Sequence, residues 1–184
     1  QHLDTLQLSE SKAIAQRIAA TWQSPKVQSL SEATQEKIIR LINNAISAIN
    51  KQTEAQVETL GRFLDFLEQI VRRTAYLSLL IEFPHALERV IRMMAASDWA
   101  AKFLNRHPIL LDELLDETVL HQVPDWDNFA AELQVKMQAQ QGDIESQLDT
   151  LREIHHALQF RLLAQDLEGR VSVEHLADLL SKLA

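Results

Sequence analysis

The fold is decided by residues 57–84, which read VETLGRFLDFLEQIVRRTAYLSLLIEFP. Apolar residues recur there every three or four positions, which is the spacing of one helix face. They are Val57, Leu60, Leu64, Leu67 and Val71, flanked by Phe63, Phe66, Ile70, Leu77, Leu80 and Ile81. The pattern ends only at Pro84, so we predict one helix of roughly 25 to 28 residues, about 40 Å long. Such a helix would be the spine of a bundle.

Shorter apolar stripes on both sides of this stretch predict further helices. One ends at Ser24, because the following Pro25 disfavours helical geometry in the residue before it. Ser31 can cap the next helix, and Pro84 suits a first helical position, where its missing N–H costs nothing. The sequence also predicts helix starts at Ser97, Pro108, Asp125 and Ser172, and breaks at Gly142 and Gly169.

A second long helix is predicted from Ile144 to about Gln165. Its apolar seam consists of Ile144, Leu148, Leu151, Leu158 and Leu162. His155 lies on this seam, whereas the side chain of His156 points about 100° away, so the two cannot chelate one metal ion. We interpret His155 as a packed core residue.

The composition agrees with a helical class. The 184 residues include three Gly and four Pro, and aromatic residues make up 5%. Abundant Ala, Leu, Gln and Glu favour helix over sheet. We therefore predict an all-α fold, a multi-helix bundle with two long helices and short helix-turn-helix corners. Residues 1–30 would form an N-terminal helix and linker, and residues 31–184 a helical connecting domain that could divide into sub-bundles of about 31–121 and 122–184.

Charge and cysteine usage exclude several classes of function. The 26 acidic and 18 basic residues give a formal net charge of -8, which repels nucleic-acid phosphates and anionic lipid. No cysteine is present, which excludes thiol chemistry in this sequence and fits the reducing cytoplasm. No apolar run approaches the roughly 18 residues of a membrane helix. We expect a cytoplasmic segment of a longer protein that binds neither nucleic acid nor membrane.

One pattern is typical of phosphoryl-transfer chemistry, namely Asp125 and Asp127 in the order Asp-x-Asp. Nucleotidyltransferases use such a pair, on a strand and after a Gly-Gly or Gly-Ser turn, to bind Mg²⁺. Neither glycine turn occurs in this chain, and the surrounding residues lack the alternation of a strand. We interpret Asp125 as a helix cap and expect no catalytic, cofactor-binding or metal-binding residue in this segment.

Other polar residues are candidates for interaction or structure. Asp112, Glu113 and Asp116, with Glu117, could gather a hard cation, but on a helix they form a polar ridge opposite leucines, so we interpret them as a solvated face.

A second group lies earlier in the chain. Arg73 shares a helix face with Tyr76, and Glu82 follows. Arg73 could contact an anion or pair with a carboxylate, and the excess of acidic residues favours the pair. Trp99, Phe103 and Trp126 could mark docking surfaces, although such helix residues more often belong to the core.

Arg73 to Asp116 also resembles a helical segment of the glutamine synthetase adenylyltransferases and adenylyl-removing enzymes. The resemblance lies in RTAYLSLLIEFPHAL at 73–87, AAS at 95–97 and RHPILLDELLD at 106–116. A second match, RLLAQDLEG at 161–169, resembles the helices that lead into the second nucleotidyltransferase domain of that family. Together the matches cover about residues 31–184.

The resemblance implies a place between two nucleotidyltransferase domains. One would remove AMP from a tyrosine of glutamine synthetase by phosphorolysis, and the other would attach AMP from ATP. ATP and Mg²⁺ are thereby implied for the parent enzyme, and the flanking domains, glutamine synthetase and the PII signalling protein are implied as partners. We expect a non-catalytic connecting or regulatory segment; the alternative is a free-standing helical scaffold or adaptor that binds a partner helix.

Overall fold

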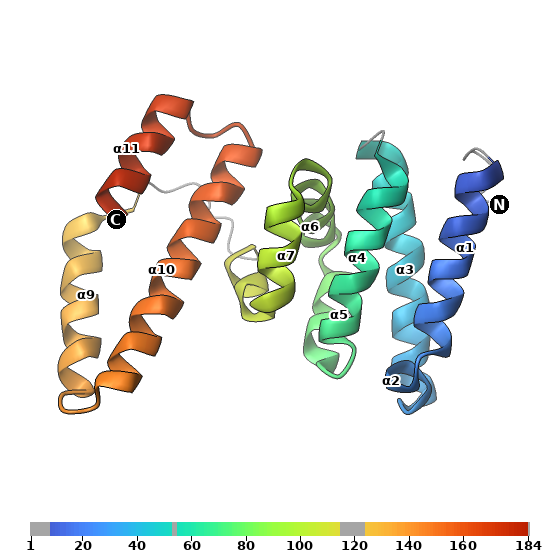
Figure 1. The fold of residues 1–184 in the computed structure, drawn as a ribbon, viewed down its shortest axis with the longest axis horizontal. Helices are drawn as coiled ribbons and strands as arrows, with labels where there is room; N and C mark the ends of the chain where they lie inside the picture. Colours follow the sequence, from blue (N-terminus) through green and yellow to red (C-terminus); the bar gives the residue numbers. More distant parts are fainter. Residues whose placement is uncertain (1–7, 53–54, 115–123, 184) are drawn as a thin grey trace. The chain divides into compact units, whose positions relative to one another are not determined.

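The computed structural model describes residues 8–52, 55–114 and 124–183, where every regular element is a helix (Figure 1). The chain folds as two compact units, Gln1–Leu111 and Asp112–Ala184. The first contains α1 (Leu8–Gln23), α2 (Pro25–Gln28), α3 (Glu32–Gln52), α4 (Gln56–Ile70), α5 (Thr74–Glu82), α6 (Pro84–Ala96) and α7 (Asp98–Arg106). The 3-10 helix η1 (Pro108–Leu114) is followed in the second unit by α9 (Trp126–Ala139), α10 (Ile144–Leu167) and α11 (Val173–Leu183). The prediction of an all-α fold is confirmed.

The helix starts follow the predicted caps. The Ser97 Oγ accepts a hydrogen bond from the Ala100 N–H at 3.2 Å, and the Ser172 Oγ accepts one from the His175 N–H at 3.2 Å. Each bond satisfies an N–H that has no partner within its own helix. Pro84 is the first residue of α6, also as predicted. No helix in the described ranges is long and apolar enough to cross a membrane.

The prediction of one unbroken helix over residues 57–81 is wrong. α4 ends at Ile70 and α5 begins at Thr74. The Arg73 N–H donates to the Ile70 carbonyl at 2.7 Å, which closes a turn between the two helices. Packing accounts for the break: α5 lies against α3 and α6, where Leu77 and Leu80 are fully buried.

The core of the first unit is built around α4. This helix contacts α1, α3, α6 and α7 (Figure 1), and Phe63, Phe66 and Leu67 are completely buried in it. Polar contacts surround the apolar centre. Arg17 of α1 pairs with Asp65 of α4, and the Lys37 Nζ of α3 donates to the Ser78 Oγ of α5 at 2.7 Å.

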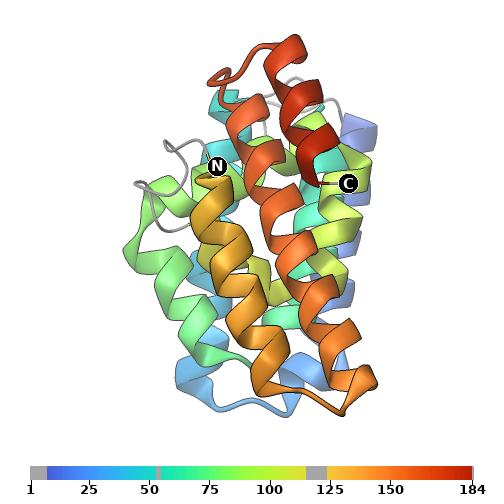
Figure 2. The same cartoon turned by 90° about the vertical axis from the view of Figure 1, so that its left-hand side faces the viewer.

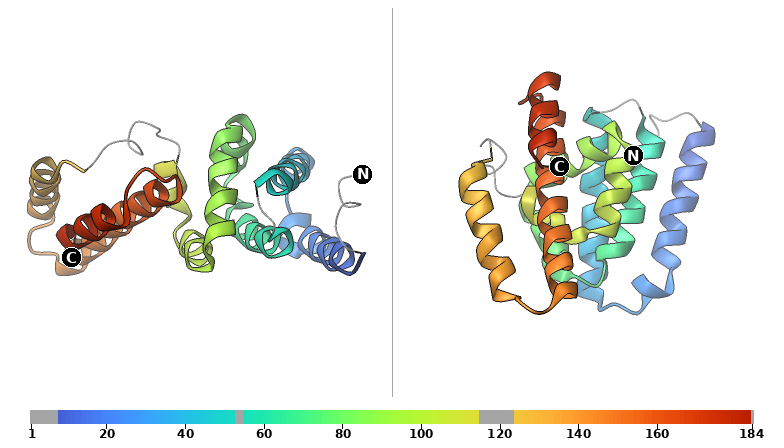
Figure 3. Two further views of the ribbon diagram at one scale, coloured as in Figure 1. Left: turned by 90° about the horizontal axis from the view of Figure 1, so that it is seen from above. Right: turned by 60° about the vertical axis from the view of Figure 1, so that its left-hand side comes forward.

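The second unit is organised by α10, which contacts both α9 and α11 (Figure 2). The predicted breaks at both ends are present: Gly142 (φ 95) lies in the turn before α10, and Gly169 (φ 66) follows it. The Arg170 N–H donates to the Gln165 carbonyl at 2.9 Å and the Gly169 N–H to the Asp166 carbonyl at 2.8 Å. These two bonds are those of a Schellman motif, which fixes the turn into α11 (Figure 3).

The seam of α10 is buried only in its second half. Leu158 and Leu162 are buried, whereas Ile144, Leu148 and Leu151 are exposed. His155, interpreted as a core residue, is half-buried. The continuous apolar stripe therefore predicted the helix correctly, although the first half of the stripe is exposed.

Two glycines should respond to alanine with opposite signs. A Cβ added at Gly169 would meet no atom within 4 Å, but its positive φ strains any L side chain, so Gly169→Ala should destabilise the second unit by about 1 kcal/mol. Gly61 lies inside α4 with equally open space, so Gly61→Ala should stabilise the first unit by about 0.5 to 1 kcal/mol. Calorimetric unfolding of each variant measures both shifts. A stabilising effect of Gly169→Ala would contradict the Schellman geometry.

Candidate functional site

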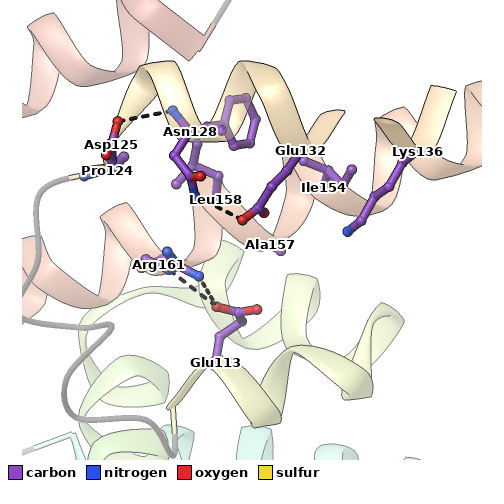
Figure 4. A pocket seen from close by; sticks show the side chains of 11 residues that line it. Glu113, Pro124, Asp125, Asn128, Glu132, Lys136, Ile154, Ala157, Leu158 and Arg161 are labelled. Carbon is purple, nitrogen blue, oxygen red and sulfur yellow. Dashed lines mark hydrogen bonds and ion pairs between the residues drawn. The ribbon is translucent and has the colours of Figure 1, made fainter. Parts of the chain in front are cut away.

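A polar groove of about 370 Å³ lies between α9 and α10 (Figure 4). Its polar side chains come from η1, from the cap and most of the length of α9, and from the second half of α10. They are Glu113, Asp125, Asn128, Glu132, Lys136 and Arg161. Three carboxylates and two cations thus face a small space whose apolar wall includes Phe129 and Leu158.

Glu113 and Arg161 form an ion pair in the groove. The Arg161 Nη2 and Nε both donate to the Glu113 Oε2, at 2.8 and 3.3 Å. The two side chains are only 25% and 27% exposed, so water screens this pair less than a surface pair. The pair joins η1 to α10 across 48 positions of sequence.

Asp125 directly precedes α9 and caps it with its carboxylate. Its Oδ1 accepts hydrogen bonds from the Asp127 N–H at 3.2 Å and from the Asn128 N–H at 3.1 Å. The Asn128 Nδ2 in turn donates to the Glu132 Oε1 at 2.9 Å, one turn later (Figure 4). The interpretation of Asp-x-Asp as a capped helix start is confirmed. Among the residues that the structure describes, no group of three His, Asp or Glu side chains could hold a metal ion.

The candidates from the sequence do not form one site. The Arg73 guanidinium lies 5.7 Å from the centre of the Tyr76 ring, a cation–π contact at the start of α5. Glu82 ends the same helix and is exposed, about 12 Å further along its axis. Asp112 and Glu113 belong to the second unit. Asp116 and Glu117 lie outside the described residues.

The two described acids of the predicted ridge differ in environment. Glu113 is paired with Arg161, so its interpretation as a solvated residue is wrong. Asp112 is exposed and has no such partner in the described part of the chain. Partial desolvation, and secondarily the charge of Glu113, raise the pKa of the Asp112 carboxyl above its ordinary value.

Sequence reasoning missed a second polar cluster, in the first unit. The Arg62 Nη1 donates to the Met94 carbonyl in the last turn of α6 at 2.6 Å, and the Arg62 Nε lies 3.7 Å from Asp98. The Lys102 Nζ lies 2.6 Å from the same carboxylate. Chiefly through the hydrogen bond from Lys102, the pKa of Asp98 is lowered. The spacing of Asp98 and Lys102 by four residues could have predicted their ion pair, because residues four apart are neighbours on a helix. The contact between Arg62 and the Met94 carbonyl joins residues 32 positions apart, which no sequence spacing indicates.

The aromatic candidates are divided between core and surface. Phe103 is buried, and Trp99 is 53% exposed and stacks on it with ring centres 4.8 Å apart. Trp126 is half-buried and meets Phe129 edge to face. Of these three candidates, Trp99 is the most exposed.

Comparison with known proteins identifies the family. The family model of glutamate-ammonia ligase adenylyltransferase matches residues 87–184, which is more than half of the chain. The chain belongs to this family. The resemblance recognised in its sequence is thereby confirmed.

Relatives in the adenylyltransferase family are similar over most of this chain. A bifunctional glutamine synthetase adenylyltransferase/adenylyl-removing enzyme from Ralstonia nicotianae is 44% identical over 176 residues, 96% of this chain and 18% of that protein. One from Aromatoleum aromaticum is 53% identical over 127 residues, 69% of this chain and 14% of that protein. One from Chromobacterium violaceum is 38% identical over 182 residues, 99% of this chain and 20% of that protein. The chain spans a fifth or less of the length of these relatives.

A double-mutant cycle should measure the contact between Glu113 and Arg161 in this adenylyltransferase-family chain. We expect the two alanine substitutions to be coupled by about 1 kcal/mol, because the ion pair is partly shielded and has two N–H donors. Asp149 and Arg152 on α10, 2.9 Å apart and more than 60% exposed, provide the control, with coupling below about 0.5 kcal/mol. Equal coupling energies in the two pairs would contradict the expectation that partial shielding strengthens the pair of Glu113 and Arg161. Chemical unfolding of each variant gives the free energies.

The raised pKa of Asp112 predicts a pH-dependent substitution effect. A carboxyl whose pKa is higher in the folded state than in the unfolded state stabilises the fold at low pH and loses that contribution as pH rises through the folded pKa. Asp112→Asn should therefore raise the unfolding midpoint at neutral pH, and the gain should disappear below the ordinary pKa of 3.8. Unfolding curves at several pH values test this, and a gain that persists at pH 3 would refute it.

Proposed function

We propose that this chain is a non-catalytic helical connecting segment of an enzyme that attaches AMP to glutamine synthetase and removes it. Membership in the adenylyltransferase family and the names of the relatives support the parent activity. The segment would position flanking nucleotidyltransferase domains in the cytoplasm, and those domains would use ATP and Mg²⁺. Glutamine synthetase and PII are the proposed partners, and exposed Trp99 is a candidate contact for either.

One observation carries the non-catalytic assignment, namely the role of Asp125. A magnesium site for AMP transfer needs two carboxylates that converge on one ion. The Asp125 Oδ1 instead accepts two backbone N–H groups at the start of α9, and Asp127 follows in the first helical turn. Side chains two positions apart on a helix point in widely different directions, so convergence on one ion is unfavourable.

The connecting role is supported by the architecture of the chain. Each of the two compact units is built from helices, and the first has a core of large, fully buried side chains such as Phe63 and Phe66. Packed helices transmit position because their interiors are dense and resist deformation. The segment could therefore set where flanking domains lie without supplying a reacting group.

Substitutions at Asp125 in the full-length enzyme test the proposal. Asparagine caps helices as well as aspartate does but is a poor ligand for Mg²⁺, so Asp125→Asn should leave both AMP attachment and AMP removal within about threefold of wild type. Asp125→Ala removes the cap and should destabilise α9 by about 1 kcal/mol. Transfer of labelled AMP to and from purified glutamine synthetase measures both activities.

The Asp125→Asn variant separates the capping role of the Asp125 carboxylate from a role in binding a metal ion. If Asp125 bound a catalytic metal ion, the asparagine variant would lose one of the activities as completely as the alanine variant, which would refute the proposal. Asp127→Asn should likewise leave both activities intact. A substitution of the paired aspartates in a flanking nucleotidyltransferase domain serves as the positive control, because it should abolish transfer without affecting α9.

A further inference from the structure

α9 contributes no buried side chain to the core of the second unit. None of its 14 residues is buried, and Val135 is 66% exposed. The described core of this unit comes from η1, α10 and α11, and consists of Leu114, Leu158, Phe160, Leu162, Ala164 and Leu179. Of α9, α10 and α11, α9 is therefore the helix on which this core depends least.

The side of α9 that faces α10 borders a groove instead of packed side chains. Asn128, Glu132 and Lys136 lie one helical turn apart on one wall of the groove of about 370 Å³, and α10 forms the opposite wall (Figure 4). All three side chains are polar and exposed. Three apolar side chains of α9 are only half-buried, namely Phe129, Leu133 and Met137. Because packed interiors leave no gap of this size, α9 gains little attraction from α10 along the groove.

Hydrogen bonds hold α9 to α10 beside the turn that joins the two helices. The Gln147 Nε2 donates to the Met137 carbonyl at 2.9 Å, and the Thr150 Oγ1 donates to the Gln140 Oε1 at 2.9 Å. Gly142 (φ 95) lies in the turn between these contacts. The last turn of α9 is therefore fixed to α10.

The opposite end of α9 has no such tie to α10 among the described residues. There the Asp125 carboxylate accepts N–H groups of α9 itself. The Asn128 side chain donates to Glu132 of the same helix. α9 is thus attached by polar contacts near Gly142 and stands free of them near Asp125.

We propose that α9 is an order–disorder element, which detaches from α10 and unwinds as far as the turn at Gly142 while α10 and α11 stay folded. Segments with few buried apolar contacts open at a lower free energy than the core beside them. A helix of 14 residues is also marginal in water without tertiary contacts, so detachment is accompanied by loss of its helical hydrogen bonds. The open state removes one wall of the groove and exposes the pair of Glu113 and Arg161 to water.

Unwinding lengthens the reach of the chain between Asp125 and Gln140. As a helix the 14 residues of α9 span about 21 Å, whereas the same residues in an extended chain span at most about 50 Å. α9 would thus be an extensible connection between the residues before it and α10. This consequence rests on the proposed connecting role, whereas the opening of α9 does not.

Amide hydrogen exchange in the full-length enzyme tests the inference. Peptides from α9 are compared with peptides from residues 158–165, the buried part of α10. After correction for intrinsic rates, we expect the hydrogen-bonded amides of α9 to exchange at least about 100-fold faster, because they need only local opening. Protection of α9 within about threefold of that of residues 158–165 would overturn the inference. So would rates that fall steadily from both ends of α9 to its middle, which would indicate fraying.

A matched pair of variants on α10 locates the hinge. Thr150→Val keeps the shape of the side chain but removes its hydrogen bond to Gln140, so the opening equilibrium constant of α9 should rise about fivefold. Asp149→Asn weakens an exposed ion pair with Arg152 on the same helix and should leave exchange in α9 unchanged. Equal effects of the two variants on α9 would contradict a hinge at this turn. An equal acceleration in residues 158–165 by Thr150→Val would show that α9 and α10 open as one unit, which also contradicts the inference.

The two proposals can fail separately. Amide exchange needs no substrate, so it reports on α9 whichever protein receives AMP. Loss of AMP transfer in the Asp125→Asn variant would overturn the non-catalytic assignment and leave the exchange pattern intact, because asparagine keeps the cap of α9. The melting temperature of each variant, compared with that of the parent, shows whether faster exchange comes from global unfolding.

Discussion

Burial of the apolar side chains of α4 is the interaction on which the first unit depends. Phe63, Leu64, Phe66 and Leu67 have no exposed surface, and each such side chain contributes roughly 1.5 to 3 kcal/mol through removal from water. Their directions cover well over a third of the helix circumference, so one partner helix cannot cover them all. α1, α3, α6 and α7 therefore gather around α4, and the chain must turn at Arg73 to bring α5 onto α3.

Features that depend on local hydrogen bonds were predictable from the sequence. Ser97, Asp125 and Ser172 cap the helices that follow them, because a short polar side chain can reach N–H groups two or three residues ahead. Pro84 and Gly169 constrain their own backbone angles in the same local way. The turn at Val71 to Arg73 was not predictable, because no glycine or proline marks it and its cause is packing on distant helices.

The candidate site shows the same division between local and distant effects. The role of Asp125 followed from the residues around it, whereas the partner of Glu113 lies 48 positions away on α10. Nothing in the spacing of η1 distinguishes Glu113 from Asp112, although one carboxylate is paired and the other is exposed. Arg73, Tyr76 and Glu82 shared a helix in the sequence pattern, but the start of α5 at Thr74 left Arg73 at its boundary.

The turn at Gly169 has a consequence for how the sequence of this region can change over evolution. Main-chain hydrogen bonds from Arg170 and Gly169 determine the direction in which α11 leaves α10. Because no side chain takes part in those two bonds, substitutions on the outer surfaces of α10 and α11 can accumulate without altering the angle between the helices. A glycine at one position thus sets the geometry of this hairpin through its main chain, independently of the side chains on the outer surface.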